Sequence, residues 1–326
     1  MKVRSVYSKT PLRITLAGGG TDVLWYSRLY GGAWVSAAID KYVNVYISDS
    51  SKTSNKINST HPIISQCLKL ANTKRNLEIK SSSDVPPGSG LGGSGAFEVG
   101  ILNALYRFQE KLVTQEQLAQ KATYIEIRKL KKPVGPQDQY ITALGGIKYF
   151  EIDKTGRVTY ESLKIKPETV SLLEENLLFF STNIQRDAAT VLNDAKKGLL
   201  DNIKSNKIIS ALNEIKSLGL LAKKFLILGQ LDDFGSTLHQ HWLIKKRLSG
   251  KISSPKVDEW YNEALKAGAI GGKMMGAGGG GWLVFYVNKN KNRFREKMIK
   301  TGLKEQKVKF DWKGTRAIAR NRNYHD

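Results

Sequence analysis

The residues that most constrain this chain form a glycine-rich loop in its first third, which reads Asp-Val-Pro-Pro-Gly-Ser-Gly-Leu-Gly-Gly-Ser-Gly-Ala at positions 84–96. Glycine permits positive φ angles and lets the backbone approach a ligand closely. A mostly apolar segment follows at once, and we predict a helix over residues 91–110. Such a helix directs its free N–H groups and the positive end of its dipole at the loop. The pattern therefore predicts an anion site, most plausibly one for phosphates.

Two other kinds of glycine loop fit this stretch less well. The P-loop signature requires a lysine directly after its last glycine, and Ser94 follows Gly93 here. The dinucleotide-binding fingerprint needs a buried strand that runs straight into its first glycine. The glycine spacing of this fingerprint is matched by Gly88, Gly90 and Gly93. However, two prolines directly precede Gly88, and a strand is not expected to run through them because proline cannot donate to a sheet ladder. A simple glycine-rich turn between a strand and a helix stays open as an alternative.

Two further glycine clusters lie far from this loop in the sequence. Residues 18–22 read Gly-Gly-Gly-Thr-Asp, and residues 271–281 read Gly-Gly-Lys-Met-Met-Gly-Ala-Gly-Gly-Gly-Gly. Each cluster abuts a strand-like apolar run, at residues 12–16 and 282–287 respectively. Glycine clusters beside strands in three distant parts of the chain indicate backbone that converges on one ligand.

These motifs resemble those of the GHMP kinases, the superfamily of galactokinase, homoserine kinase, mevalonate kinase and phosphomevalonate kinase. Its members share an N-terminal Pro-x-Arg strand, a central Pro-x-x-x-Gly-Leu-Gly-Ser-Ser-Ala loop and a C-terminal glycine-rich loop. All three motifs occur here in the same order, although the central loop reads Gly-Leu-Gly-Gly-Ser, with an extra glycine. Within the superfamily the chain most resembles the D-glycero-D-manno-heptose 7-phosphate kinases, over residues 11–22, 83–94, 137–140, 145–146 and 271–281.

The predicted elements favour an α+β fold, because strands and helices alternate without a steady β-α-β rhythm. The resemblance implies the two-domain GHMP kinase fold, with an N-terminal domain like the second domain of ribosomal protein S5 and a ferredoxin-like C-terminal domain. We place the N-terminal domain, which carries the ATP-binding loop, at residues 1–170 and the C-terminal domain at residues 171–326. The junction is expected within residues 164–175, with the active site between the domains.

Hydrophobic periodicity and turn residues predict the individual elements. The predicted strands cover residues 5–8, 14–16, 34–38, 43–47, 77–81, 148–152, 158–163, 177–181, 273–275, 282–287 and 308–312. The predicted helices cover residues 91–110, 114–129, 136–144 and 293–300, a first helix from residue 21 or 22 to 29, and a helical region over 187–266 with breaks near Gly229 and Gly250. The helix at residues 114–129 opens with a capping-box pattern.

Composition excludes several other classes of protein. With 326 residues, of which 40% are hydrophobic and 25% charged, the sequence is typical of a soluble globular protein. No apolar run reaches the ~18 residues that span a bilayer, and the first residues lack the apolar stretch of a signal peptide. The single cysteine, Cys67, fits a reducing cytosol, and the histidines show no zinc-like spacing. We therefore expect a cytoplasmic monomer or homodimer that does not associate with membranes.

The formal net charge of +23 admits three explanations. Basic proteins bind nucleic acid, and they also steer small anionic substrates. The third explanation is a lysine-rich composition spread over solvated faces, which is the usual setting of charge runs. We favour the third for most of the excess, because the aromatic-basic interleaving typical of single-strand binders is not evident. Nucleic acid is therefore not an expected partner.

The resemblance implies ATP and Mg²⁺ as cofactors. The ATP phosphates would bind to the central loop, at Pro87, Gly88, Ser89, Gly90, Leu91, Gly92, Gly93 and Ser94. The metal would be held by the Ser94 hydroxyl and by Glu126, which corresponds to the glutamate about a dozen residues before the catalytic aspartate. Mg²⁺ prefers hard oxygen ligands of this kind. From the residues alone, Ser94 is equally a helix cap, and Glu126 a solvated side chain paired with Lys129.

The resemblance assigns the chemistry to Asp138 and Arg13. Asp138 corresponds to the aspartate that orients or deprotonates the acceptor hydroxyl, and Arg13 to a basic residue that lowers its proton affinity or stabilises transferred charge. Alone, Asp138 is an ordinary first-turn acid favoured by a helix dipole, and Arg13 belongs on the outward face of an edge strand. An arginine in an apolar run needs a carboxylate partner if it is buried. An Arg13–Asp138 ion pair would satisfy both residues.

The acceptor is expected to contact the first and third glycine clusters and a cationic subsite, at Gly19, Gly20, Thr21, Asp22, Arg186, Lys273, Gly278 and Gly279. Asp22 matches a residue that binds sugar hydroxyls in sugar kinases, and an N-cap of the next helix is the alternative. Galactokinase carries Glu-His where this chain has Gly19 and Gly20, which leaves room for a larger sugar. Arg186 and Lys273 are candidates to bind a phosphate that the acceptor already carries.

The resemblance implies an ATP-dependent kinase that phosphorylates the anomeric hydroxyl of D-glycero-D-manno-heptose 7-phosphate, giving the 1,7-bisphosphate. Two alternatives remain. One is another GHMP sugar 1-kinase, of the galactose or fucose type. The other is a catalytically silent, basic RNA-binding protein on the same fold, which the charge of +23 motivates.

Overall fold

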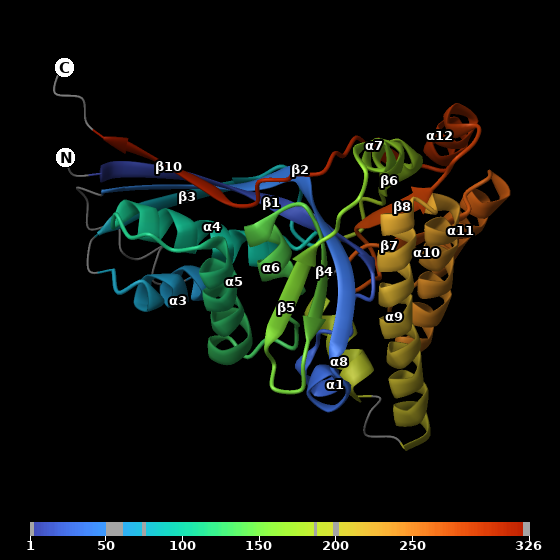
Figure 1. Ribbon diagram of the computed structural model, residues 1–326, viewed down its shortest axis with the longest axis horizontal. Helices are drawn as coiled ribbons and strands as arrows, with labels where there is room; N and C mark the ends of the chain where they lie inside the picture. The colour runs from blue at the N-terminus through green and yellow to red at the C-terminus, as the bar shows by residue number, and fades with distance from the viewer. Residues whose placement is uncertain (1–2, 50–60, 74–75, 186–187, 198–201, 322–326) are drawn as a thin grey trace.

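The computed structural model describes residues 3–49, 61–73, 76–185, 188–197 and 202–321. Figure 1 shows a long sheet with helices beneath it, and beside it a smaller sheet surrounded by the helices of the second half of the chain. The structure has the α+β organisation that the sequence predicts, since each sheet is antiparallel among the described residues and helices pack on it.

The first sheet contains six described strands, ordered β10-β1-β2-β4-β5, with β3 paired to another part of β2. Its members are β1 (Val3–Ala17), β2 (Gly32–Asp49), β3 (Leu77–Ser83), β4 (Ile147–Ile152), β5 (Val158–Ser162) and β10 (Arg316–Asn321). The last strand of the described chain therefore pairs with the first one, although about 300 residues separate them in the sequence. The domain boundary near residue 170 stays a prediction, and β10 returns across it.

β1 and β2 are longer than predicted, because each joins two expected short strands into one continuous strand. The pairing register between β1 and β2 shifts between Pro11 and Leu12, close to where the sequence pattern breaks. Proline cannot donate to a ladder, and a register irregularity bends a strand without ending it. The alternation of side chains is interrupted there, so the sequence shows two strands where the structure has one.

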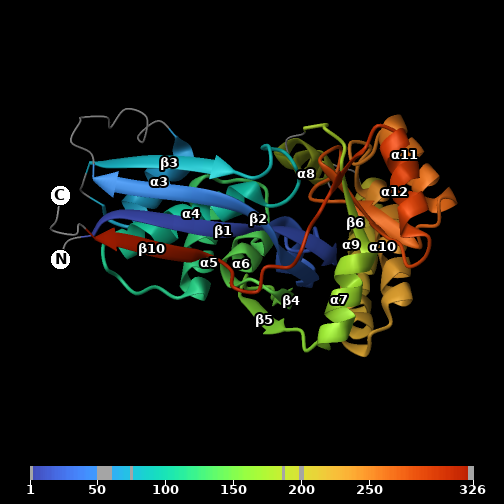
Figure 2. The same ribbon diagram turned by 90° about the horizontal axis from the view of Figure 1, so that it is seen from above.

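One face of the first sheet is covered by helices (Figures 1 and 2), and helix α9 (Asn202–Leu228) packs against the start of β2 and the end of β1, where Gly219 meets the Ala33 backbone. The covering helices are α3 (Pro62–Leu70), α4 (Gly93–Phe108), α5 (Gln115–Thr123) and α6 (Gln137–Leu144). α4 is buried along most of its length, as expected of a helix that is apolar nearly all round. The predicted capping box is present at the start of α5. A π-helical turn, η1 (Tyr124–Lys129), continues α5 to the predicted end.

The second sheet contains four described strands in the order β7-β8-β6-β9. They are β6 (Leu177–Ser181), β7 (Gly271–Met274), β8 (Trp282–Tyr286) and β9 (Lys304–Gln306). The helices of the second half are α8 (Ala188–Lys197), α9 (Asn202–Leu228), α10 (Leu231–Lys245) with the short turn η3 (Lys246–Leu248), α11 (Pro255–Lys266) and α12 (Lys291–Lys300). The predicted breaks near Gly229 and Gly250 are confirmed.

Six elements differ from the prediction, which contained neither strand β9 nor strand β10. Residues 164–175 were expected to be a junction, and most of them form helix α7 (Pro167–Asn176). Helix α3 was not predicted. Helix α1 (Leu24–Tyr30) begins after Val23, so neither Thr21 nor Asp22 is its cap. The strand predicted at residues 308–312 is wrong: Phe310 makes only an isolated bridge to Ile39, on the way to β10.

The two halves share a hydrophobic core. One cluster of buried side chains runs from the first sheet and α4 into β6, β8, α9 and α10, and a smaller cluster joins Val23 and Tyr26 of the α1 region to the inner faces of α9 and α10. Burial of this kind is the main favourable term in folding and holds the halves in a defined arrangement. Within the described residues, no helix is both long and apolar enough to cross a membrane.

Glu98 is an unusual member of the N-terminal core. It lies on α4 with no exposed surface, and neither of its carboxyl oxygens makes a hydrogen bond within the described structure. Burial raises the pKa of Glu98 to about 10, and the nearby Glu126 carboxylate adds to the effect. Glu98 is therefore protonated at neutral pH, since a neutral carboxylic acid is far less costly to bury than a carboxylate.

We predict that Glu98→Gln changes how stability depends on pH. The pKa of Glu98 is higher in the folded than in the unfolded chain, so its contribution to stability is fully present below about pH 4 and is lost as pH rises toward 10. Each pH unit in that window costs up to about 1.4 kcal/mol. Urea unfolding at pH 6 and pH 9 should show a smaller loss of stability in the variant than in the natural protein.

The matched control is Glu259→Gln, at an exposed glutamate of α11, which should leave the pH dependence unchanged. A Glu98→Gln protein whose stability falls between pH 6 and pH 9 as steeply as that of the natural protein would show that Glu98 is already ionised in the fold.

Candidate active site

Two pockets meet at the centre of the molecule. We call the first the loop pocket, which is bounded by the central glycine-rich loop and the end of β3, at residues 81–94. The second, the inner pocket, is bounded by the first glycine cluster, residues 134–137 and side chains of α8, α9 and α10. Arg13, Asp138, Gly276 and Ala277 line both pockets. A group transferred between molecules in the two pockets would therefore pass these residues.

The loop pocket brings together all eight residues predicted to bind ATP, from Pro87 to Ser94. Helix α4 starts within it: Gly92 is the N-cap, in a left-handed conformation, and no side chain caps the helix. The first N–H groups of a helix have no partner within the helix, so this end of α4 presents donors and the positive end of its dipole to the pocket. These are the features of an anion site.

The glycines of the loop allow it to lie directly against Arg13 and Asp138. A Cβ atom on Gly92 would lie 2.9 Å from Cγ of Arg13, and one on Gly95 would lie 2.8 Å from Cβ of Asp138. Gly92 also has a φ of +75°, which non-glycine residues rarely adopt. Side chains at these positions would push the loop away from the ion pair.

The third glycine cluster packs against the same loop. A Cβ on Gly90 would lie 2.7 Å from the Met275 carbonyl oxygen, one on Gly276 would lie 2.7 Å from Cα of Gly90, and one on Gly281 would lie 2.3 Å from the Ser89 carbonyl oxygen. The backbones therefore approach more closely than side chains would permit. The convergence of distant glycine clusters, which the sequence suggested, is present in the structure.

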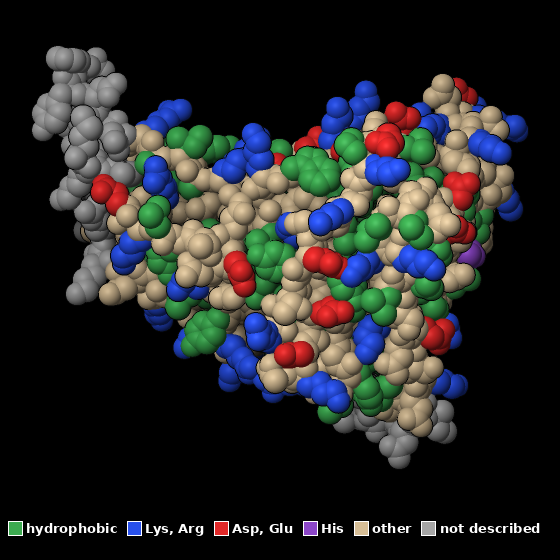
Figure 3. Space-filling model, in the orientation of Figure 1, with side chains coloured by type: hydrophobic (Ala, Val, Ile, Leu, Met, Phe, Trp, Pro, Cys, Tyr) green, Lys and Arg blue, Asp and Glu red, His purple; other side chains and the backbone are tan. Residues whose placement is uncertain are grey.

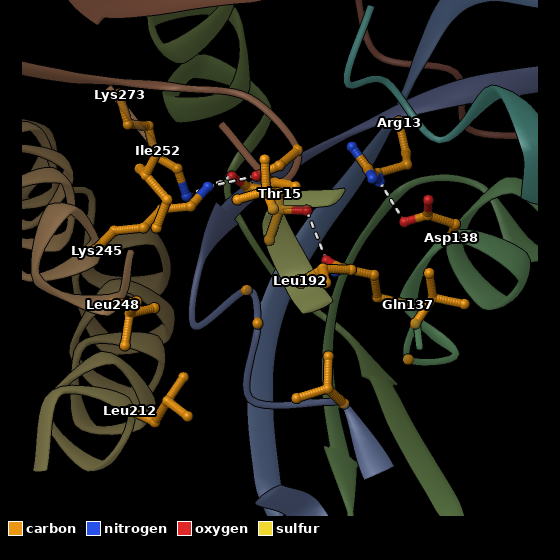
Figure 4. A pocket seen from close by; sticks show the side chains of 18 of the residues that line it. Arg13, Thr15, Gln137, Asp138, Leu192, Leu212, Lys245, Leu248, Ile252 and Lys273 are labelled. Atoms are coloured by element: carbon orange, nitrogen blue, oxygen red, sulfur yellow. Dashed lines mark hydrogen bonds and ion pairs between the residues drawn. The ribbon is translucent and has the colours of Figure 1, made fainter. Parts of the chain in front are cut away.

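The predicted ion pair between Arg13 and Asp138 is present. Nε of Arg13 donates to Oδ1 of Asp138 over 2.7 Å, and Nη1 donates to the Gly90 carbonyl oxygen over 2.6 Å. β10 pairs with β1 only as far as Lys9, and at Arg13 the backbone amide donates instead to the Leu91 carbonyl oxygen over 3.0 Å. Only 4% of Arg13 is exposed, so it does not lie on an outward face. Both residues line both pockets, and Figure 4 shows the ion pair at the edge of the inner one.

Ser94 and Glu126 also lie together, at the edge of the loop pocket. The Ser94 hydroxyl donates to Oε1 of Glu126 over 2.7 Å, and Nζ of Lys132 lies 2.7 Å from that oxygen and 3.0 Å from Oγ of Ser94. Gln139 donates to the other Glu126 oxygen. Ser94 is therefore not a helix cap, and Glu126 is a buried residue paired with Lys132 rather than a solvated one paired with Lys129.

Glu126 owes its position to the π-helical turn η1. Such turns insert an extra residue into a helix and often occur at functional sites. The sequence offered no sign of this turn. The sequence analysis also missed Gln139 as a partner of Glu126, although Gln139 directly follows Asp138 on α6.

Gly19, Gly20 and Lys273 line the inner pocket as predicted, whereas Thr21 and Asp22 do not. The Thr21 hydroxyl is buried and donates to the Gly18 and Ala33 carbonyl oxygens. Both residues were predicted to contact the acceptor; the structure places them behind residues that line the pocket, and their contact with an acceptor stays a prediction.

Asp22 is covered by the backbone of the chain before α6. A Cβ on Gly135 would lie 2.0 Å from Oδ2 of Asp22, so Gly135 separates this carboxyl from the pocket. Asp22 accepts hydrogen bonds from the backbone amides of Gly20 and Gln137 and ties the first glycine cluster to α6. Burial, and then the charge of Asp138, raises the pKa of Asp22 to about 6.

The remaining predicted acceptor residues are not brought together. Gly278 lines the loop pocket rather than the inner one, and the amide of Gly279 donates to the Ile252 carbonyl oxygen over 2.7 Å. The Cβ of a side chain at Gly278 would meet the Ile252 backbone, so both glycines serve the packing of the third cluster. Arg186 lies outside the described residues.

Lys245 was missed by the sequence analysis. It ends α10 and lines the inner pocket, where its ammonium donates to the Gly276 carbonyl oxygen. Burial, and then the charge of Arg13, lowers the pKa of Lys245 to about 7. In the sequence this residue opens the basic run Lys245-Lys246-Arg247, and such a run is typical of a solvated helix end.

Comparisons with known proteins agree with this geometry. The chain matches the families described as GHMP kinases N terminal domain, over residues 60–146, and GHMP kinases C terminal, over residues 208–303. It is 30% identical to the D-glycero-alpha-D-manno-heptose 7-phosphate kinase of Campylobacter jejuni, over 96% of this chain and 98% of that protein.

Solved structures show the same fold. A D-glycero-D-manno-heptose 1-phosphate kinase from Bacteriodes thetaiotaomicron superposes with a TM-score of 0.77 and 24% identity, over 96% of this chain and 98% of that one. Lactococcus lactis galactokinase in complex with galactose superposes with a TM-score of 0.73 and 17% identity, over 96% and 95% of the two chains. From its sequence matches and its fold, this chain belongs to the GHMP kinase family, as a sugar kinase that transfers a phosphoryl group to an alcohol acceptor.

Proposed function

We propose that this kinase transfers the γ-phosphate of ATP to the anomeric hydroxyl of D-glycero-D-manno-heptose 7-phosphate and so forms the 1,7-bisphosphate. The observation that carries the proposal is the Arg13–Asp138 ion pair at the junction of a glycine-lined pocket and a second pocket lined by lysines. The heptose assignment is supported by the 30% identity to a heptose 7-phosphate kinase over nearly the whole length of both chains.

The loop pocket is proposed to bind the ATP phosphates through backbone N–H groups of residues 88–94 and the start of α4. Ser94 and Glu126 fit Mg²⁺, because they offer two hard oxygens 2.7 Å apart. The Lys132 ammonium bonds both of these oxygens, so Mg²⁺ would take the place of this ammonium. When bound there, Mg²⁺ would neutralise charge on the β- and γ-phosphates.

Asp138 is proposed to orient the acceptor hydroxyl. Arg13 occupies one of its carboxylate oxygens, and no described residue donates a hydrogen bond to the other. That free oxygen can accept the hydroxyl hydrogen and direct a lone pair of the attacking oxygen at the γ-phosphate. An anomeric hydroxyl is more acidic than an ordinary alcohol, so positioning and a weak base suffice. Arg13 then places positive charge beside the group in transfer.

The acceptor is proposed to occupy the inner pocket, with Gly19 and Gly20 against the sugar. Gly20 has open space on its Cα, and a Cβ on Gly19 would lie 2.7 Å from Cγ2 of Thr15. Galactose or fucose as the acceptor stays an alternative. The comparisons leave the RNA-binding alternative without support, and Figure 3 shows basic side chains on one face spread among acidic ones rather than gathered in one patch.

Replacement of Asp138 by asparagine tests the orienting role. Asparagine keeps the shape but removes the negative charge that accepts the proton, so we expect kcat to fall by about 10²- to 10⁴-fold with little change in ATP affinity. Steady-state kinetics with heptose 7-phosphate, together with titration of an ATP analogue, measure both quantities. Asp233→Asn, at an exposed aspartate of α10, is the control, and full turnover in Asp138→Asn would remove Asp138 from the mechanism.

The metal ligands are tested by Ser94→Ala and Glu126→Gln. Each change removes one hard oxygen ligand, so the Mg²⁺ concentration for half-maximal activity should rise by about 10-fold or more. The measurement is initial rate against free Mg²⁺ at fixed ATP. Ser236→Ala, on the exposed side of α10, should leave this concentration unchanged. The same Mg²⁺ requirement in both test variants would show that neither residue is a ligand.

A panel of acceptors tests the proposed reaction itself. ATP consumption is measured with heptose 7-phosphate, heptose 1-phosphate, galactose, fucose and mevalonate, and the product is identified by ³¹P NMR. We expect preference for the 7-phosphate and a new anomeric phosphate signal. Preference for an unphosphorylated sugar or for the 1-phosphate would disprove the heptose 7-phosphate assignment and leave the family assignment intact.

A further inference from the structure

We propose that Lys245 and Lys273 form a phosphate subsite in the inner pocket, and that Lys245 thereby selects acceptor sugars that already carry a phosphate. The inference rests on the proposed sugar kinase function and adds to it a specificity-determining residue. Lys273 was a candidate from the sequence, whereas Lys245 is known only from the fold.

The two lysines come from different elements and point into one place. Lys245 ends α10 and Lys273 lies on β7, yet both line the inner pocket. They are 7% and 2% exposed respectively. Figure 4 shows their ammonium groups close together on the side of the pocket opposite Asp138. Lysine is rarely buried to this extent unless a partner offsets the loss of hydration.

Neither lysine has an acidic partner in the described structure. Lys245 donates to the Gly276 carbonyl oxygen. Lys273 donates to the Thr15 carbonyl oxygen over 3.1 Å and lies 3.1 Å from Nδ1 of His241. All of these partners are neutral. Burial lowers the pKa of both lysines for this reason, and an anionic ligand in the pocket would stabilise their charged forms.

The hydrogen-bonding capacity of the pair matches a phosphate group. Each ammonium has three N–H donors. Lys245 uses one of them within the protein and Lys273 uses two, when His241 is the acceptor at Nδ1. Three donors then remain for the pocket. A phosphate monoester presents three terminal oxygens that accept charge-assisted hydrogen bonds.

The position of the subsite also agrees with a terminal phosphate. The reacting hydroxyl must lie near Asp138, and the lysines lie across the pocket from it (Figure 4). The pocket wall also carries the apolar side chains of Leu192, Leu212 and Leu248. A 7-phosphate is at the far end of a heptose from its anomeric carbon, so one molecule would place its two ends at the two charged sites.

The decisive experiment compares D-glycero-D-manno-heptose 7-phosphate with the same heptose lacking the phosphate. We expect Lys245→Met to lower the ratio of the two kcat/KM values by about 10- to 100-fold, the range for charge-assisted hydrogen bonds, and Lys245→Arg to restore part of it. Lys246→Met is the matched control, because Lys246 is the next residue and pairs with Asp258. A ratio that is unchanged, or equal losses with both sugars, would overturn the subsite.

Binding of inorganic phosphate tests the subsite without turnover. Phosphate is titrated by calorimetry into protein whose loop pocket is filled by a non-hydrolysable ATP analogue. We expect the natural protein and the Lys246→Met variant to bind phosphate, the Lys245→Arg variant to bind it in part, and the Lys245→Met variant not to bind it. Equal binding by Lys245→Met would overturn the inference. If the natural protein binds phosphate but phosphorylates neither heptose, the proposed reaction fails and the subsite stands.

The same titration should show proton uptake. Burial lowers the pKa of Lys245 to about 7 in the free protein, and a bound phosphate raises it. The groups that face Lys245 are Arg13, Lys273 and His241, and Asp138 is neutralised by Arg13. At pH 8 phosphate is already a dianion, so binding should take up protons from the buffer and weaken as pH rises. If the Lys245→Met variant took up as many protons as the natural protein, Lys245 would not be part of the phosphate subsite.

Discussion

The buried ion pair between Arg13 and Asp138 is the interaction around which both pockets are arranged. Arg13 is buried, whereas the Asp138 side chain is 24% exposed. Removal of Asp138 would leave a buried guanidinium without its carboxylate, at a cost of several kcal/mol. The pair joins β1 to α6, and the bond from Arg13 to the Gly90 carbonyl oxygen adds the central loop. Three segments that are distant in the sequence are thereby held at one point, where the two pockets open into each other.

This arrangement requires glycine at the points of closest approach. The loop reaches the ion pair because Gly92 and Gly95 have no side chains. The third cluster reaches the loop because Gly90 and Gly276 lie in direct backbone contact. Backbone N–H groups can then line a pocket beside a carboxylate, which is the combination that phosphoryl transfer requires: donors for the phosphate and an acceptor for the hydroxyl proton.

Buried charge around the pockets is not balanced pair by pair. Asp22, Glu98 and Lys245 each have a pKa displaced toward the neutral form, mainly by burial. Groups of this kind are concentrated at functional sites. Here the acidic ones lie behind the walls of the pockets and Lys245 faces the inner one. The fold thus accepts the unfavourable burial of a lysine whose charged form an anion in the inner pocket would stabilise.

Local sequence signals determined much of the outcome: the α+β class, the capping box at Thr114, the glycine loop at the start of a helix, and the need of Arg13 for a carboxylate. The resemblance to known kinases supplied the expected roles of Asp138 and Glu126. Tertiary structure alone decided that Gly135 hides Asp22, that Lys132 rather than Lys129 meets Glu126, and that Lys245 enters the inner pocket. It also replaced the strand expected at residues 308–312 by the return of β10 to β1. The physical reason is common to these cases: burial and contact depend on the packing of segments that lie far apart in the chain, whereas propensities, caps and glycine conformations act within a few residues.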